Sequence, residues 1–238
     1  MKPAKDMTVK IFADGADLAG MLEMYRNPVI KGFTTNPTLM RKAGVNDYQA
    51  FARSVLSAIP DRPISFEVFS DQFEEMERQA REISSWGSNV YVKIPISNTK
   101  REPAYGVARR LSESGVKINV TALMTPDQVA GVTAAVAHGA PCYISVFAGR
   151  IADSGRDPIP IMVEALQIMK GAPQAELIWA SPRELLNIVQ ADEIGCHIIT
   201  ATNAILQNLD RIGVDLDTFS AETVRMFHED ARAAGYQL

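Results

Sequence analysis

Short β-rich runs alternate with longer amphipathic stretches along the whole chain, and this alternation restricts the possible folds more than any other feature. Repeated βα units of this kind build a parallel sheet covered by helices. Eight strands are predicted, at residues 9–13, 32–35, 64–68, 90–94, 117–121, 142–147, 177–180 and 197–200. The crossover helices are predicted at residues 18–25, 48–59, 72–86, 104–113, 126–137, 159–169, 182–190 and 204–212. Eight units are enough to close a ring, so we predict an α/β fold, a single (β/α)8 TIM barrel over residues 1–238.

An open, doubly wound sheet is the alternative arrangement of such units. That fold usually carries a Gly-rich phosphate-binding turn after its first strand, whereas residues 14–17 of this chain read DGAD. The barrel is therefore favoured. Residues 216–235 form a further helical pattern that the barrel does not need, and we expect it to cap a face or to pack on a neighbouring subunit. The longest predicted loop, residues 148–158, is expected to be functional.

Composition excludes several classes of protein. No apolar run approaches the roughly 18 residues of a membrane span, and the N-terminus lacks the apolar core of a signal peptide, so we expect a cytoplasmic protein without membrane contact. A net charge of −4 argues against nucleic acid as a partner. The two cysteines, Cys142 and Cys196, lie in apolar runs typical of buried, reduced thiols. The three histidines show no metal-binding spacing, so we expect neither a metal nor another cofactor.

Lys93 interrupts an apolar strand, between Val92 and Ile94, where a lysine is rarely buried without a reason. In one interpretation it is a cation inside the barrel wall, neutralised by a carboxylate. In the other it is a nucleophile, because burial disfavours the charged ammonium and leaves a neutral amine able to attack a carbonyl. We predict the second role, formation of a Schiff base with a sugar carbonyl.

Other polar residues follow the predicted strands, at the barrel end where active sites lie. Asp14 and Glu67 are candidates for proton transfer, although Asp14 is also a candidate helix cap and Glu67 a candidate partner that only neutralises Lys93. Arg150 and Arg183 follow late strands, where barrels frequently bind phosphate. Alternatively, Arg150 pairs with Asp153 or Asp157 in its own loop, and Arg183 lies on a helix surface beside Asn187. The remaining strand-end candidates are Asn36, Asn119, Thr121, Ser145, Ser181, Thr200 and Thr202.

The motifs around these residues resemble those of the transaldolases over nearly the whole chain. They are residues 11–17 (IFADGAD), 32–38 (GFTTNPT), 92–95 (VKIP), 119–121 (NVT), 145–151 (SVFAGRI) and 180–183 (ASPR). The resemblance implies a (β/α)8 barrel whose lysine, here Lys93, forms a Schiff base with a ketose phosphate. The enzyme then releases an aldose phosphate and passes the bound dihydroxyacetone unit to another aldehyde.

The same resemblance implies a role for each site residue. Asp14 transfers a proton at the carbon–carbon bond, while Glu67 and Thr121 hold a catalytic water. The expected substrate-binding residues are Asn36 and Asn119 at the dihydroxyacetone hydroxyls, Ser145 in the pocket wall, and Arg150, Ser181 and Arg183 at the phosphate.

The chain is similar to the compact subfamily, which contains transaldolases and fructose-6-phosphate aldolases. The aldolases typically carry Gln at the position of Glu67 and Tyr at that of Phe147, so both residues favour a transaldolase. Gly15 stands where the family usually has Thr, and Pro182 replaces a usual aromatic residue, so a barrel acting on another sugar phosphate is an open alternative. Members of the subfamily form rings of subunits, and we expect a homo-oligomer, with a decamer as one candidate size.

Two alternatives come from other classes. One is an isomerase or lyase that uses Glu67 as its general base, with Lys93 as an electrostatic partner. The other is a sugar-phosphate sensor or assembly protein without catalysis, for which replacement of the lysine or its proton-transfer partners is expected, and none is replaced.

Overall fold

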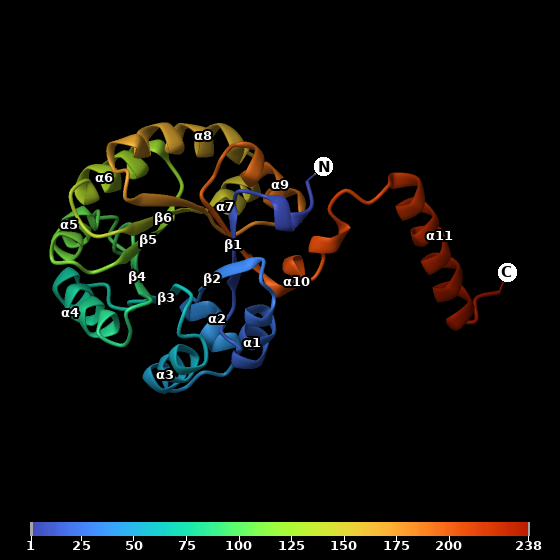
Figure 1. Ribbon diagram of the computed structural model, residues 1–238, viewed down its shortest axis with the longest axis horizontal. Helices are drawn as coiled ribbons and strands as arrows, with labels where there is room; N and C mark the ends of the chain where they lie inside the picture. Colours follow the sequence, from blue (N-terminus) through green and yellow to red (C-terminus); the bar gives the residue numbers. More distant parts are fainter. Residues whose placement is uncertain (1, 238) are drawn as a thin grey trace.

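A computed structural model describes residues 2–237 of the chain. Eight parallel strands follow one another around a closed barrel, and β8 pairs with β1 to complete the ring. Helices surround the barrel on its outer side (Figure 1), so the predicted (β/α)8 fold is confirmed. The strands are β1 (Lys10–Asp14), β2 (Ile30–Thr34), β3 (Ile64–Glu67), β4 (Val90–Pro95), β5 (Ile118–Leu123), β6 (Cys142–Val146), β7 (Ala175–Trp179) and β8 (Ile198–Thr202).

The α-helices differ from the sequence prediction mainly where they are short. The prediction of a loop at residues 148–158 was wrong for its first half, where the chain forms the helix α7 (Ala148–Asp153). The helix predicted at 182–190 begins only at Leu186, and that at 204–212 is the short α10 followed by a 3₁₀ turn, Leu209–Arg211. The other helices are α1 (Leu18–Arg26), α2 (Pro37–Lys42), α3 (Tyr48–Ala58), α4 (Phe73–Ser84), α5 (Tyr105–Glu113), α6 (Pro126–Val136), α8 (Pro158–Ile168), α9 (Leu186–Glu193), α10 (Asn203–Leu206) and α11 (Leu216–Ala233).

Polar side chains at the strand-to-helix turns set where several helices begin. Asp17 accepts a hydrogen bond from the Gly20 amide and caps α1, so Asp14 is not the cap of this helix. Thr125 and Gln128 form a reciprocal capping box at the start of α6. These caps hold the helices close behind the carboxyl ends of the strands, where the polar candidates lie.

Two apolar cores hold the barrel together. The larger fills the space between the strands and the surrounding helices. A smaller aromatic core fills the inside of the barrel, where the Phe12 and Tyr143 rings meet edge to face and Tyr91 stacks on Tyr143 with ring centroids 4.0 Å apart. Gly32 allows this packing, because a Cβ there would lie 2.6 Å from the Phe12 ring. The inner core closes the barrel below the polar strand ends.

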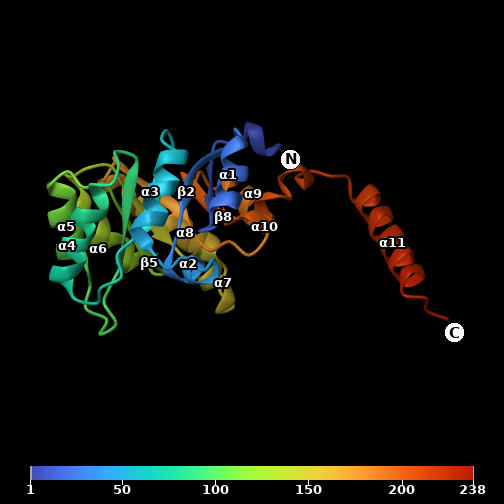
Figure 2. The ribbon, with the colours of Figure 1, turned by 90° about the horizontal axis from the view of Figure 1, so that it is seen from below.

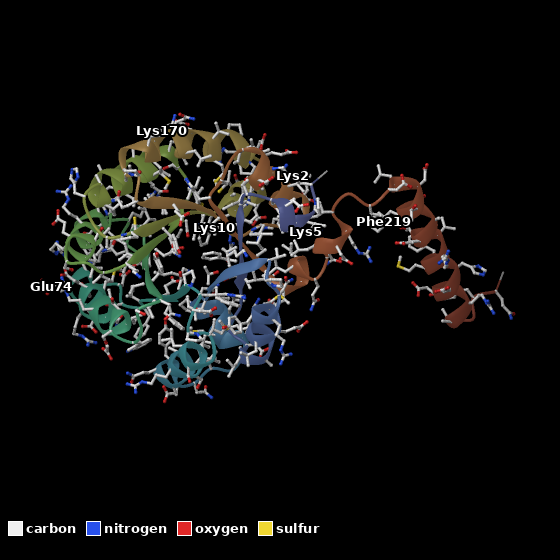
Figure 3. The ribbon with its side chains drawn as sticks, in the orientation of Figure 1. Lys2, Lys5, Lys10, Glu74, Lys170 and Phe219 are labelled. Atoms are coloured by element: carbon white, nitrogen blue, oxygen red, sulfur yellow. The ribbon has the colours of Figure 1, made fainter. Side chains whose placement is uncertain are left out.

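The last helix, α11, stands away from the barrel at the end of a connecting segment (Figures 1 and 2). None of its residues is buried, and Phe219 lies at its barrel-proximal end (Figure 3). Leu216, Val224 and Phe227 are 79%, 64% and 63% exposed. Within residues 2–237, no helix combines the length and the apolar character needed to cross a membrane.

Candidate active site

A cavity of about 520 Å³ opens at the carboxyl ends of the strands, within the size range of small-molecule sites. The helices α2 and α7 lie at this end of the barrel (Figure 2). All eleven predicted site residues line this one cavity: Asp14, Asn36, Glu67, Lys93, Asn119, Thr121, Ser145, Phe147, Arg150, Ser181 and Arg183. The structure therefore brings together residues that are far apart in the sequence, while their roles stay predictions.

Strand register places Lys93 between two polar neighbours. Glu67 on β3 pairs with Lys93 on β4, which in turn pairs with Asn119 on β5, so the three side chains project at one level. Lys93 Nζ lies 2.9 Å from Glu67 Oε2 and donates a hydrogen bond of 2.9 Å to the Thr35 carbonyl oxygen. Its side chain is 7% exposed and that of Glu67 16%. The amine is thus held at the cavity floor by one charged and one neutral acceptor.

Asp14 lies on the same floor, at the end of β1. Its Oδ1 accepts a hydrogen bond of 2.7 Å from the Thr34 hydroxyl, whose oxygen lies 2.6 Å from that of Thr200. Burial raises the pKa of Asp14, the positive charge of Lys93 and the Thr34 hydrogen bond lower it, and the negative charge of Glu67 raises it. A carboxyl with a raised pKa beside an amine is suited to exchanging protons with a bound substrate.

A polar wall continues from Lys93 across β5 and β6. Ser145 donates to Asn119 Oδ1 at 2.7 Å, and Asn119 Nδ2 donates to the Ser65 hydroxyl at 3.1 Å. Thr121, two residues further along β5, has a buried hydroxyl that finds no hydrogen-bond partner within the described chain. An unpaired buried hydroxyl costs free energy unless water or a ligand binds it. The cavity therefore contains an unsatisfied polar group on the strand next to that of Lys93.

The rim beyond β6 and β7 carries two arginines. Arg150 lies on α7, and Arg183 follows Ser181, whose φ of 62° is unusual for a residue other than glycine. Arg183 Nε donates to Asp153 Oδ1 at 2.9 Å, and the terminal nitrogen of the same guanidinium contacts the other carboxylate oxygen. A Cβ at Gly149 would lie only 1.6 Å from the Ser181 carbonyl oxygen, so only glycine lets α7 approach this turn. The rim is thus a positively charged corner built by two elements in close contact.

Several lining residues complete the site. Asn36 caps α2 by accepting from the Leu39 amide at 2.9 Å, so only its amide nitrogen is left to donate. Phe147 packs on the inner aromatic core below the rim. The wider candidates Thr200 and Thr202 also line the cavity, as do Thr34 and Lys42 among the residues that the sequence did not select.

The sequence contained a signal for only some of these omissions. Thr34 lies one residue from the end of a predicted strand and within the motif of residues 32–38. The rule that polar residues at strand ends are site candidates could therefore have selected it. Lys42 lies on α2, a helix absent from the prediction, and no sequence signal placed its side chain in the cavity. Asp153 lies on α7, also absent from the prediction, and the sequence offered it only as a local partner of Arg150. Among residues 2–237, no group of three or more potential metal ligands comes together.

Comparison with known proteins identifies the family of this chain. The family model for transaldolase/fructose-6-phosphate aldolase matches residues 11–238. A probable transaldolase of Dehalococcoides mccartyi is 32% identical over 202 residues, which cover 84% of this chain and 90% of that protein. A probable transaldolase of Thermoanaerobacter sp. is 31% identical over 231 residues, covering 97% and 100% of the two chains. A solved putative phosphonomutase from Burkholderia cenocepacia, 12% identical, superposes with a TM-score of 0.59 over 93% of this chain and 96% of its own, and so shares the fold alone.

Proposed function

Because this chain belongs to the transaldolase/fructose-6-phosphate aldolase family, we propose that it is a transaldolase that works through a Schiff base on Lys93. The donor is a ketose phosphate, sedoheptulose 7-phosphate or fructose 6-phosphate, and the acceptor is an aldose phosphate. The position of Lys93 Nζ carries this proposal, because the amine lies 2.9 Å from the Glu67 carboxylate on the floor of a sugar-sized cavity.

The reaction begins at the amine of Lys93. Its neutral form attacks the ketose carbonyl, and loss of water from the carbinolamine gives the Schiff base. Glu67 is placed to take and return the protons that this exchange requires, and the unpaired Thr121 hydroxyl is suited to holding the water molecule. The three groups lie on the neighbouring strands β3, β4 and β5 and line one cavity, which supports assigning them to the same part of the reaction.

Asp14 acts at the carbon–carbon bond. It takes the proton from the hydroxyl of the fourth sugar carbon, the new carbonyl forms there, and the electrons of the broken bond pass to the Schiff base. The aldose phosphate leaves, and the dihydroxyacetone unit stays bound to Lys93 until the acceptor aldehyde reverses these steps. The Asn36 amide, Asn119 and Ser145 are placed to bind its hydroxyls.

The phosphate of either sugar fits the corner formed by Arg150, Ser181 and Arg183. A guanidinium recognises phosphate through paired hydrogen bonds, and Asp153 already fixes the orientation of Arg183. Electrostatic attraction therefore favours the sugar with its phosphate at the rim and its carbonyl at Lys93. The proposed reaction needs no metal and no cofactor.

Borohydride reduction tests the covalent step. Reduction in the presence of fructose 6-phosphate should fix a three-carbon fragment on Lys93, and peptide mass spectrometry should locate it. Lys42 lines the same cavity and is an internal control, since an adduct there would indicate indiscriminate labelling. Absence of any lysine adduct would refute the Schiff base and favour an enzyme that uses Glu67 as a general base.

The closest competing activity is that of a fructose-6-phosphate aldolase, which releases free dihydroxyacetone. Glu67 and Phe147 favour transfer, because a phenylalanine at that site has no hydroxyl to orient the water that releases the fragment. We would measure transfer from fructose 6-phosphate to erythrose 4-phosphate beside cleavage of fructose 6-phosphate alone. Cleavage as fast as transfer would assign the aldolase activity instead.

We propose further that α11 packs on a second copy of this chain in a ring-shaped homo-oligomer. The helix leaves its own barrel with Leu216, Val224 and Phe227 exposed, which is costly for a helix that remains alone in water. Sizing the protein with and without the residues after Thr218 tests this. An unchanged oligomer after truncation would refute the exchange of this helix.

A further inference from the structure

Two buried threonine hydroxyls, those of Thr200 and Thr34, form a hydrogen-bonded series that ends on the Asp14 carboxylate. Thr200 on β8 lies beneath the site with its Oγ1 2.6 Å from Thr34 Oγ1, and Thr34 donates to Asp14 Oδ1 at 2.7 Å. Thr34 is 1% exposed and Thr200 6%. Within the described chain, Thr34 is the sole side-chain partner of the Thr200 hydroxyl and Asp14 Oδ2 has none.

Counting protons fixes the direction of this series. Each threonine hydroxyl has one proton to donate, and an ionised carboxylate only accepts. When Asp14 is ionised, the Thr34 hydroxyl donates its proton to Asp14 Oδ1. The 2.6 Å contact between the Thr34 and Thr200 hydroxyls then requires Thr200 to be the donor. Hydrogen bonds that run in one direction polarise and strengthen one another.

We propose that Thr200 is a positioning residue for the reaction. Its hydrogen bond keeps the Thr34 hydroxyl donating to Oδ1 of Asp14, so that Oδ2 is the oxygen that exchanges the proton with the substrate. This inference rests on the proposed function. At cleavage the sugar hydroxyl gives its proton to Oδ2, its O–H electron pair forms the carbonyl, and the carbon–carbon pair moves to the Schiff base. During transfer to the acceptor, Oδ2 returns the same proton.

The charged groups facing Asp14 are Lys93 from β4, which favours its ionised form, and Glu67 from β3, which opposes it. Neither contacts Thr200 by a hydrogen bond or ion pair. Replacing Thr200 with valine keeps the shape of the side chain and removes only its donor. The ionised form of Asp14 should then lose part of its stabilisation while the surrounding charges stay in place.

The experiment follows the ¹³C signal of the Asp14 carboxyl during pH titration of the substrate-free protein, assigned with Asp14→Asn. Thr200→Val should raise the titration midpoint by about a few tenths of a pH unit, and Thr34→Val, which removes the direct donor, by about one unit. Thr200→Ser should retain the wild-type midpoint. Thr133→Val is the matched control, because this buried hydroxyl on α6 has no partner in the described chain.

A midpoint in Thr200→Val equal to that in Thr133→Val would overturn the inference, and Thr200→Ala makes the same comparison if the valine variant does not fold. The acid limb of kcat/KM for transfer should move in the same direction as the midpoint, and a limb that stays in place would overturn the assignment of the proton exchange to Asp14. A wild-type protein without transfer activity would instead refute the proposed function, whereas the titration would still show whether the series of hydroxyls acts on Asp14.

Discussion

Replacing Lys93 with methionine should destabilise the protein as well as abolish catalysis. The amine and the Glu67 carboxylate lie 2.9 Å apart, with side chains only 7% and 16% exposed. Removing one partner of a buried pair leaves the other charge uncompensated, at a cost of about 3–5 kcal/mol. Because this pair borders an open cavity, we expect the lower part of that range, about 3 kcal/mol, which corresponds to roughly 6–12 °C in Tm for a chain of this size.

A double-mutant cycle in urea separates the pair from other effects of the substitution. Glu67→Gln combined with Lys93→Met removes both charges and should recover about 2 kcal/mol of the loss. Lys10→Met is the control, since its 2.6 Å pair with Glu176 has side chains 49% and 29% exposed and should contribute under about 1 kcal/mol.

The pH dependence has a definite sign. Lys93 lowers the pKa of Asp14, so its removal raises that pKa further above the value in the unfolded chain. A carboxyl with a raised pKa destabilises the fold at neutral pH, and the penalty disappears as the pH falls toward the unfolded pKa of about 4. The stability gap between wild type and Lys93→Met should therefore narrow at low pH. A gap below about 1 kcal/mol at neutral pH, or additive effects in the cycle, would refute the reasoning.

Three further predictions concern single substitutions. Phe147→Tyr should raise the rate of free cleavage relative to transfer, and an unchanged ratio of the two rates would count against its role. Asp153→Asn should weaken competitive inhibition by inorganic phosphate about two- to fivefold, because Arg183 loses the partner that orients it. Glu184→Gln is the control: it removes a nearby charge that forms no ion pair with Arg183 among the described residues, and phosphate inhibition should stay unchanged. Asp14→Asn should abolish transfer and raise Tm at neutral pH, by roughly 3–5 °C for each unit by which the Asp14 pKa exceeds its unfolded value, with no gain near pH 4.

The barrel and most of its site could be predicted because strand periodicity and the location of barrel active sites are strong constraints. Lys93 and Glu67 interrupt or end apolar strands, and parallel strands bring their carboxyl ends to one face. Register then makes them neighbours, although 26 positions separate them in the sequence. The sequence could not distinguish an ion pair from a nucleophile at Lys93. The structure shows the ion pair with Glu67, and the nucleophilic role stays a proposal.

The remaining features depend on packing rather than on local pattern. The helix α7 has six residues and is buried at Ala148, Gly149 and Ile151, so contacts with the barrel stabilise it where its own length does not. A loop was therefore predicted, with Asp153 as a possible partner of Arg150, and its actual pairing with Arg183 was missed. For α2 a signal was present, since Asn36 followed by Pro37 is a typical helix start.

The distribution of charge also argues for one orientation of substrate. The floor combines the carboxylates of Asp14 and Glu67 with a single cation, Lys93, and becomes more negative when the amine is neutral and ready to attack. The rim carries Arg150 and Arg183 in a protein whose net charge is −4. A sugar phosphate that entered phosphate first would place its dianion against two carboxylates, whereas the opposite orientation pairs it with guanidinium groups. In the proposed reaction, the same field would therefore bring the carbonyl to Lys93 and keep the phosphate outside the reacting floor.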